Sequence, residues 1–450
     1  MAQSIDELVW TAVFGESAEA RGAARWQIRS QAAAAGIRPA SIHDLYMAMG
    51  RGDTGGFTVP AINVRAMSYD TARAVIRAAK KLNAGAFIFE IARSEIGYTE
   101  QRPHEYSAVV LGAALREGFT GPLFIQGDHV QTNAKKYNSP DRDKELEGLR
   151  ALIKEEIAAG FYNIDIDTST LVDLSKATLA EQQEVNVNLA ADFTAFIRQQ
   201  EPQGVTVSVG GEIGEVGGKN SDVHELHAYM DGYNAAVKAR GGMVGLSKIS
   251  VQTGTAHGGF INADRTLRMD VKIDLKTLQE LSDAARNAYG LGGAVQHGAS
   301  TLPPDAFDAF PRHGACEIHL ATDFQNMVYE HARFPADLKG EMYDWIRQNA
   351  TEERKPKDTE EQFIYKARKK ALGPFKKRMW SLPPDARQAI GQSLEDRFGF
   401  LMTQLKIADT APTVARFVKA PQLAADRDAE IVAAGGKITA AEKKAEGLAD

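Results

Sequence analysis

The chain has 450 residues, of which 44% are hydrophobic and 25% are charged, as in ordinary soluble globular proteins. Its formal net charge of −6 provides no surplus of basic residues for binding phosphates, which argues against a nucleic-acid partner. The single cysteine, Cys316, excludes an internal disulfide. The sequence has neither an apolar run of membrane-spanning length nor a signal-peptide pattern at its start, so we expect a cytoplasmic protein without a membrane partner.

Residues 1–40 are rich in Ala and Arg and helical in pattern. From Phe57 onwards, short β-branched or aromatic runs alternate with longer amphipathic stretches, which is typical of βα units and a parallel sheet. Eight strands are predicted, at residues 57–64, 84–92, 122–129, 163–169, 205–214, 245–255, 293–300 and 316–323. Eight such units match the size of a (β/α)8 TIM barrel. The alternative, a doubly wound open sheet, would need a glycine-rich turn after its first strand, which is missing here.

The alternation stops beyond residue 335. Residues 336–450 are charge-rich and helical in pattern, with breaks at Pro374 and at the pair Pro383–Pro384. The predicted protein is therefore of the α/β class, with an N-terminal helical segment (1–40), a (β/α)8 barrel (41–335) and a helical C-terminal extension (336–450). Subunit contacts are one candidate role for the extension.

Residue types that bind metal ions gather at the ends of the predicted strands. Asp128 and His129 end the third strand, Glu212 lies on the fifth, His257 follows the sixth, and His297 lies on the seventh. In TIM barrels the C-terminal ends of the strands form the active-site face. Three histidines and a carboxylate from different strands are therefore expected to meet there. This ligand set suits zinc, with an open position if the site is catalytic.

Small residues follow two of these histidines directly. Gly258 follows His257, and Gly298 follows His297. Small residues let backbone N–H groups approach a bound anion closely, which favours a substrate site beside the metal. A tight turn between strand and helix would also need glycine, so each His-Gly pair leaves both interpretations open.

Seven motifs resemble, in order, those of the class II fructose-bisphosphate/tagatose-bisphosphate aldolase family over residues 41–345: VPAINV, GDH, IDTST, GEIGEVGG, TAHGG, QHGAS and IHLATD. The resemblance implies zinc ligands at His129, His257 and His297. It also implies that Glu212 is a metal-associated carboxylate and that Asp128 is the catalytic acid/base.

The resemblance also implies a substrate site. Backbone at Gly258, Gly298 and Ser300 would hold the phosphate or polar end of the substrate together with a monovalent cation, Na⁺ or K⁺. Thr322 and Asp323 would line the same pocket.

This chain departs from the family at several substrate-facing positions. The family's acidic pair after the glycine loop aligns with Lys219 and Asn220, and a phosphate-contacting lysine aligns with Ile261. The family's asparagine on the eighth strand is His319 here, and Arg93 follows the second strand.

We therefore predict that Arg93 and His319 read a different polar group of the substrate, and that His319 or a residue elsewhere supplies the missing proton transfer. Asn220 is predicted to bind the substrate as well. Alternatively, Arg93 pairs with a neighbouring acid such as Glu95 or Glu90.

The predicted function is reversible aldol cleavage of a ketose or ketose phosphate through a zinc-stabilised enediolate, by a homo-oligomer (dimer or higher). Its substrate is expected to differ from the common hexose bisphosphate. The alternatives are a fructose- or tagatose-bisphosphate aldolase proper, a non-catalytic barrel subunit of an aldolase complex, and a metal-dependent epimerase or hydrolase. Asp128 and the three histidines favour an enzyme, because a scaffold has no need of them.

Overall fold

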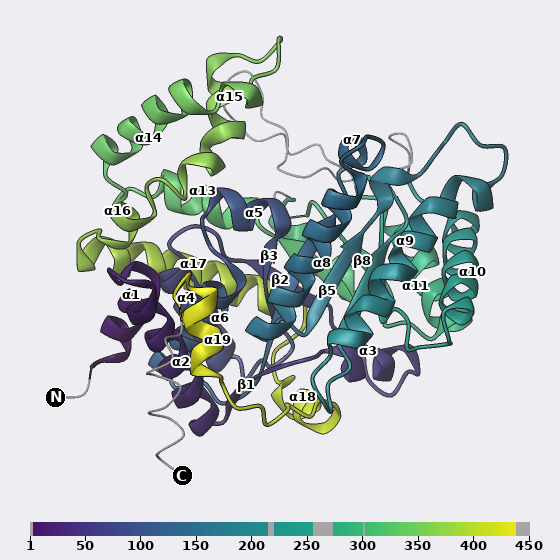
Figure 1. Cartoon of the computed structure of the whole chain (residues 1–450), viewed down its shortest axis with the longest axis horizontal. Helices are drawn as coiled ribbons and strands as arrows, with labels where there is room; N and C mark the ends of the chain where they lie inside the picture. Colours follow the sequence, from purple (N-terminus) through teal and green to yellow (C-terminus); the bar gives the residue numbers. More distant parts are fainter. Residues whose placement is uncertain (1–2, 215–219, 255–272, 300–301, 438–450) are drawn as a thin grey trace.

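The computed structural model describes residues 3–214, 220–254, 273–299 and 302–437. Eight parallel strands form a closed barrel (Figure 1), in which each strand pairs with the next along the chain and β2 pairs with β9. They are β2 (Val59–Asn63), β3 (Ile88–Ala92), β4 (Gly121–Gln131), β5 (Asn163–Asp167), β6 (Ser208–Glu212), β7 (Lys248–Val251), β8 (Ala294–Gln296) and β9 (Glu317–Leu320). Each overlaps a strand predicted from the sequence, so the predicted TIM barrel is confirmed.

Helices follow the strands and cover the outside of the barrel. They are α4 (Ser68–Lys81), α5 (Arg93–Tyr98), α6 (Pro103–Arg116), α8 (Arg142–Ala159), α9 (Leu179–Gln200), α10 (Val223–Ala239), α11 (Leu275–Tyr289) and α13 (Thr322–Glu330). Capping hydrogen bonds and the backbone conformation of single residues set where these helices begin and end. The hydroxyl of Thr178 accepts a hydrogen bond from the N–H of Glu181 at the start of α9, and Gly160, whose φ of 91° is left-handed, caps the C-terminus of α8.

The N-terminal segment contains a strand that the sequence pattern does not predict. Helices α1 (Ile5–Phe14) and α2 (Ala18–Ala34) match the expected helical character, but residues 37–40 form β1 (Ile37–Ala40). This strand pairs in parallel with the first four residues of β4. Most of that stretch precedes the point where β3 and β5 join β4, so its backbone groups need another partner.

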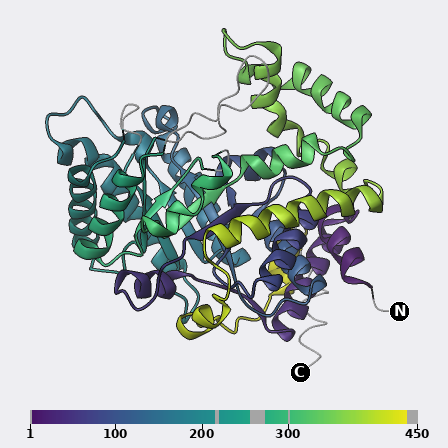
Figure 2. The ribbon, with the colours of Figure 1, turned by 180° about the vertical axis from the view of Figure 1, so that it is seen from behind.

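The C-terminal part of the chain is helical, as expected. It comprises α14 (Ala336–Asn349), α15 (Glu360–Ala367), α16 (Lys376–Trp380), α17 (Pro384–Gln404), α18 (Ala411–Phe417) and α19 (Arg427–Ala433). Seen from behind, α17 is the long yellow-green helix that crosses the outside of the barrel (Figure 2). Ion pairs join it to α4, with 2.9 Å between Arg387 and Asp70.

Helices α14 and α15 lie beyond α5 and α13, on the side of the barrel where the strands end (Figure 1). The buried apolar residues of α1, the barrel and α17 belong to one continuous cluster. The predicted boundaries of the barrel domain, at residues 41 and 335, remain a prediction. Among the helices described, none combines the length and the apolar character needed to cross a bilayer.

Candidate active site

Strand β4 ends in a bulge that brings two neighbouring side chains to the same side. Gly127 and Val130 are three residues apart, yet they pair with Ile164 and Ile166, which are two apart. Within this irregularity His129 has a left-handed φ of 42°. Consecutive side chains of a regular strand point to opposite faces, whereas a bulge re-aims them. As a result Asp128 and His129 both line the pocket at the barrel mouth.

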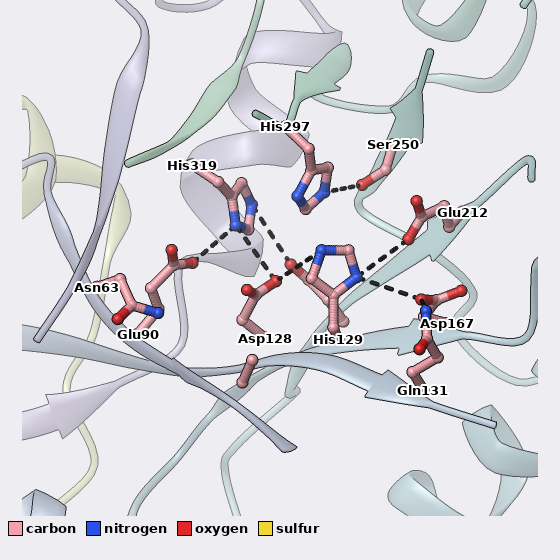
Figure 3. A network of polar contacts seen from close by, with 12 residues as sticks. Asn63, Glu90, Asp128, His129, Gln131, Asp167, Glu212, Ser250, His297 and His319 are labelled. Atoms are coloured by element: carbon pink, nitrogen blue, oxygen red, sulfur yellow. Dashed lines mark hydrogen bonds and ion pairs between the residues drawn. The ribbon is translucent and has the colours of Figure 1, made fainter. Parts of the chain in front are cut away.

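Three predicted metal ligands come together at the barrel mouth (Figure 3). His129, Glu212 and His297 each offer a ligand atom, and these atoms lie within 4.8 Å of one another. The Nδ1 of His129 is 3.4 Å from Glu212, and the rings of His129 and His297 are 4.4 Å apart. Two imidazoles and a carboxylate suit zinc, so the donor set fits the predicted ion.

Neighbouring residues orient these ligands. Asp167 lies 3.2 Å from the Nδ1 of His129 and accepts a hydrogen bond from the amide of Gln131. The hydroxyl of Ser250 lies 3.0 Å from the Nε2 of His297. Such partners hold metal-binding imidazoles in one orientation. Neither Asp167 nor Ser250 was predicted from the sequence as a site residue.

The two predicted catalytic residues also lie together. The Nδ1 of His319 is 3.3 Å from Asp128 and 2.7 Å from Glu90, and its Nε2 is 2.7 Å from Glu317. Burial by itself would lower the pKa of His319, but the carboxylates of Glu90 and Asp128 outweigh it and raise that pKa well above its usual value. The three carboxyl groups around His319 thus favour the protonated form of its imidazole.

A buried ion cluster forms the floor beneath His319. Lys248 is completely buried; its ammonium group lies 2.9 Å from Asp165 and 2.5 Å from Glu317, and donates to the amide oxygen of Gln126 at 2.8 Å. Burial opposes ionisation of Glu317, but the Lys248 ammonium outweighs it and lowers the pKa of that carboxyl. A side chain at Gly210 would approach Asp165 to 2.3 Å, so this strand needs glycine there.

This cluster was not predicted from the sequence, although charged residues inside the barrel strands indicate it. Its charged members lie inside short barrel strands, Asp165 in NIDID, Lys248 in KISV and Glu317 in EIHL, and Glu90, which contacts His319, lies in IFEIA. A charged residue inside a barrel strand is rarely buried without a partner. Four such residues therefore indicate a shared interior site.

The pocket has a volume of about 950 Å³ and contains some, but not all, of the predicted substrate-binding residues. Gly298, Thr322 and Arg93 line it. Arg93 is also bound by Glu145, at 2.5 and 3.1 Å, and donates to the carbonyl of Gln131. The positive charge of Arg93 is thus largely compensated at the rim.

Asp323 and Asn220 are not among the described residues that line the pocket. Successive residues of a helix point about 100° apart, and Asp323, next to Thr322 on α13, faces Arg397 of α17 at 2.7 Å. The amide of Asn220 donates to Asp274 at 3.1 Å.

Five positions named in the sequence analysis lie outside the described residues: Lys219, His257, Gly258, Ile261 and Ser300. Their predicted roles remain predictions.

One comparison with known proteins identifies a family. The family model for class II fructose-bisphosphate aldolase matches residues 46–390. A search of curated proteins by sequence found no match.

Solved structures of similar architecture include a protein from Sinorhizobium meliloti 1021 described as a probable tagatose 6 phosphate kinase. It is 18% identical with a TM-score of 0.54, and the match covers 84% of this chain and 97% of that one. At this identity the likeness shows a shared fold.

Two others are the fructose-bisphosphate aldolase of Campylobacter jejuni and the YdjI aldolase of Escherichia coli K12. The first is 17% identical with a TM-score of 0.48, covering 83% of this chain and 96% of that one. The second is 15% identical with a TM-score of 0.42, covering 78% and 99%.

Proposed function

Since the chain belongs to the class II fructose-bisphosphate aldolase family, it is an aldolase, and we propose that it acts with bound zinc on a ketose or ketose phosphate. The observation that carries this proposal is the convergence of His129, His297 and Glu212 beside Asp128. His257 is the further ligand expected from the sequence. When bound, zinc supplies a Lewis acid for the ketone carbonyl and stabilises the negative charge of the enediolate.

The residues of the chain account for the proton that moves during cleavage. Asp128 is buried and lines the pocket next to the proposed metal ligands. As the bond between C3 and C4 breaks, its carboxylate accepts the proton of the C4 hydroxyl, and the aldehyde half leaves. In the direction of synthesis Asp128 returns this proton to the new hydroxyl.

His319 is proposed to take part in the proton transfer at carbon. Its Nδ1 lies 3.3 Å from Asp128, close enough for the two groups to exchange a proton. Glu90 and Glu317 bind opposite sides of its ring, which holds the imidazole facing Asp128. The electron pair left on C3 would then be protonated from this pair of residues.

A zinc analysis of the purified protein tests the metal site. We expect about one zinc per chain, and loss of that zinc in the variants His297→Ala and His257→Ala, because each removes one of the few ligands. Circular dichroism of each variant controls for unfolding. Stoichiometric zinc in a folded His297→Ala protein would contradict the ligand assignment.

A retro-aldol screen of the zinc-loaded enzyme tests the substrate class. The panel contains ketoses with and without phosphate, including fructose and tagatose 1,6-bisphosphates. We expect another member to be cleaved better than either bisphosphate, because the substrate-facing residues differ from those of the family. A kcat/KM above about 10⁴ M⁻¹s⁻¹ for a bisphosphate, with nothing better in the panel, would instead identify a bisphosphate aldolase proper.

Three further expectations from the sequence stay predictions: a monovalent cation beside the substrate, assembly into a homo-oligomer, and a cytoplasmic location.

A further inference from the structure

The end of strand β4 holds His129 in a backbone conformation that is uncommon for a residue other than glycine. Its φ of 42° is left-handed, and such conformations persist where the surrounding structure enforces them. His129 lies within the irregularity between Gly127 and Val130, where the pairing with β5 shifts. The contacts that fix the chain directly after this bulge therefore help to decide where the ring of His129 points.

Asp167, at the end of β5, is the direct partner of that ring. One of its carboxyl oxygens lies 3.2 Å from the Nδ1 of His129 and accepts a hydrogen bond from the amide of Gln131 at 2.5 Å. The other accepts from the hydroxyl of Ser169 at 2.6 Å and from the backbone N–H of Ser169 at 3.1 Å. A carboxylate in this place orients a metal-binding imidazole. Asp167 is itself held from both strands, by Ser169 after β5 and by Gln131 at the end of β4.

Arg93 fixes the backbone of Gln131. It is the first residue of α5, and its guanidinium donates to the carbonyl of Gln131 at 2.5 Å. The same guanidinium donates to both carboxyl oxygens of Glu145, at 2.5 and 3.1 Å. Glu145 also accepts from the backbone N–H of Asn133 at 3.0 Å. Arg93 and Glu145 thus hold the chain after the bulge from α5 and α8, which places the side chain of Gln131.

Glu145 is a buried, ionised anchor for this arrangement. Its side chain is 2% exposed. Burial opposes ionisation, but the hydrogen bonds from Arg93 and from the N–H of Asn133 outweigh it and lower the pKa of the Glu145 carboxyl. The ammonium group of Lys136 lies 3.9 Å away. A two-point pair between guanidinium and carboxylate fixes geometry as well as charge, so the charged end of Arg93 is engaged by the protein.

From these contacts we infer that Arg93 and Glu145 are positioning residues of the metal site. They act through Gln131 and Asp167, which orient the ring of His129. This role for Arg93 differs from the substrate contact predicted from the sequence. The inference rests on the proposed function, because it takes His129 to be a zinc ligand.

The zinc Kd, measured by competition with a chromogenic chelator, tests the inference without an activity assay. Arg93→Gln and Glu145→Gln should each raise the Kd on the order of tenfold, the lower end of the usual effect of removing a residue that orients a metal ligand. Arg93→Lys should lie between Arg93→Gln and the wild type, since its ammonium group keeps the charge but cannot bind a carboxylate through a planar fork.

A double variant keeps the test valid if a single substitution prevents folding. Arg93→Gln leaves the buried charge of Glu145 without its arginine, which is destabilising. Arg93→Gln/Glu145→Gln removes both charges together, so we expect it to fold, as checked by circular dichroism, and still to bind zinc more weakly. The matched control is Arg102→Gln, which breaks an exposed pair with Glu155 of the same helix α8 outside the pocket. Its zinc Kd should equal that of the wild type.

A double-mutant cycle shows whether Arg93 acts through Gln131. Gln131→Ala removes the amide that donates to Asp167 and should raise the zinc Kd by itself. In that background Arg93→Gln should have little further effect, because residues that act through one network are not additive. Fully additive losses, or a wild-type Kd in the Arg93→Gln and Glu145→Gln variants, would overturn the inference.

Kinetics at saturating zinc separate the inference from the proposed function. An unchanged zinc Kd together with a raised KM in Arg93→Gln would mean that Arg93 reads the substrate, and would overturn the positioning role. If no ketose is cleaved but the zinc Kd depends on Arg93, the aldolase proposal fails and the positioning role stands. If ketoses are cleaved and the zinc Kd does not depend on Arg93, the positioning role fails and the aldolase stands.

Discussion

Asp128 is the residue on which the proposed chemistry depends most directly. Asp128→Asn keeps the size of the side chain but removes the base that accepts the hydroxyl proton. We expect kcat to fall on the order of 10²–10⁴-fold, the usual contribution of a general acid or base, while zinc content and circular dichroism are unchanged. An unimpaired variant would mean that another group moves this proton.

Lys248 is the residue on which the interior of the barrel depends. It is the cation that compensates Asp165 and Glu317 in a completely buried position. Lys248→Met would leave two buried carboxylates without it, and removing one partner of a buried ion pair costs about 3–5 kcal/mol. Urea unfolding should show a loss of this size.

An exposed ion pair provides the control for Lys248. Lys276 lies 3.5 Å from Glu280 on the surface, and its side chain is 87% exposed. Lys276→Met should change the free energy of unfolding by less than about 0.5 kcal/mol, because exposed pairs contribute little. Equal effects of the two substitutions would show that the interior cluster is not a stabilising unit.

Among the secondary-structure elements, α8 packs on β4 through an unusual buried acid. Glu156 of α8 is completely buried, and its carboxyl lies where a side chain at Gly127 would be, 2.6 Å from that position. Within the described part of the chain neither of its carboxyl oxygens has a hydrogen-bond partner. Burial raises the pKa of Glu156 from 4.5 to about 8. The packing of this helix should therefore depend on pH.

The direction of that dependence follows from proton binding. Between pH 4.5 and about 8, the folded state retains a proton that the unfolded state has released. The free energy of unfolding should therefore fall as pH rises through this range, by at most about 1.4 kcal/mol per pH unit from this group. Glu156→Gln cannot ionise and should remove this contribution.

Urea unfolding at pH 5, 6, 7 and 8 measures the effect of Glu156→Gln. The variant should gain stability over the wild type as pH rises. Glu147→Gln, on the exposed face of the same helix, should follow the wild type at every pH. A constant difference between Glu156→Gln and the wild type would show that Glu156 stays ionised in the folded protein.

The stability of the whole molecule should depend on zinc if His129, His297 and Glu212 bind it. A ligand that binds only the folded state at 100 times its Kd stabilises that state by about 2.7 kcal/mol. For a chain of this size that corresponds to a rise in Tm of roughly 2–6 °C. Thermal unfolding with added zinc and after chelation measures it.

The variant His297→Ala should lose the zinc-dependent shift in Tm, since it lacks one ligand. His224→Ala, which changes an exposed histidine outside the site, should keep it. A shift that persists in His297→Ala would mean that zinc stabilises the protein from another place.

The eight strands of the barrel and the polar residues at their ends were determined by the sequence itself. A strand is indicated by a local run such as FTVPAINV, and its length and flanking residues are read from neighbouring positions. In parallel barrels the carboxyl ends of all strands share one edge. Asp128, His129, Glu212 and His297 could therefore be grouped without knowing any contact between them.

The tertiary structure decided which of these side chains share an environment. The bulge that turns Asp128 and His129 to the same side depends on the pairing of β4 with β5. Lys248 is 83 and 69 residues from Asp165 and Glu317. Such contacts depend on barrel closure and strand register. A sequence pattern extends over only a few neighbouring residues, so it carries no direct information about them.

The same reason applies to the extension and to the start of the chain. The helical character of residues 336–450 was readable from composition, but the place of Lys366 beside the pocket depends on how α15 packs. Strand β1 forms because β4 begins before its neighbours β3 and β5 join it. The sequence of the four residues of β1 gives no indication of this pairing. Local propensity therefore determined the elements, and long-range packing decided the composition of the site.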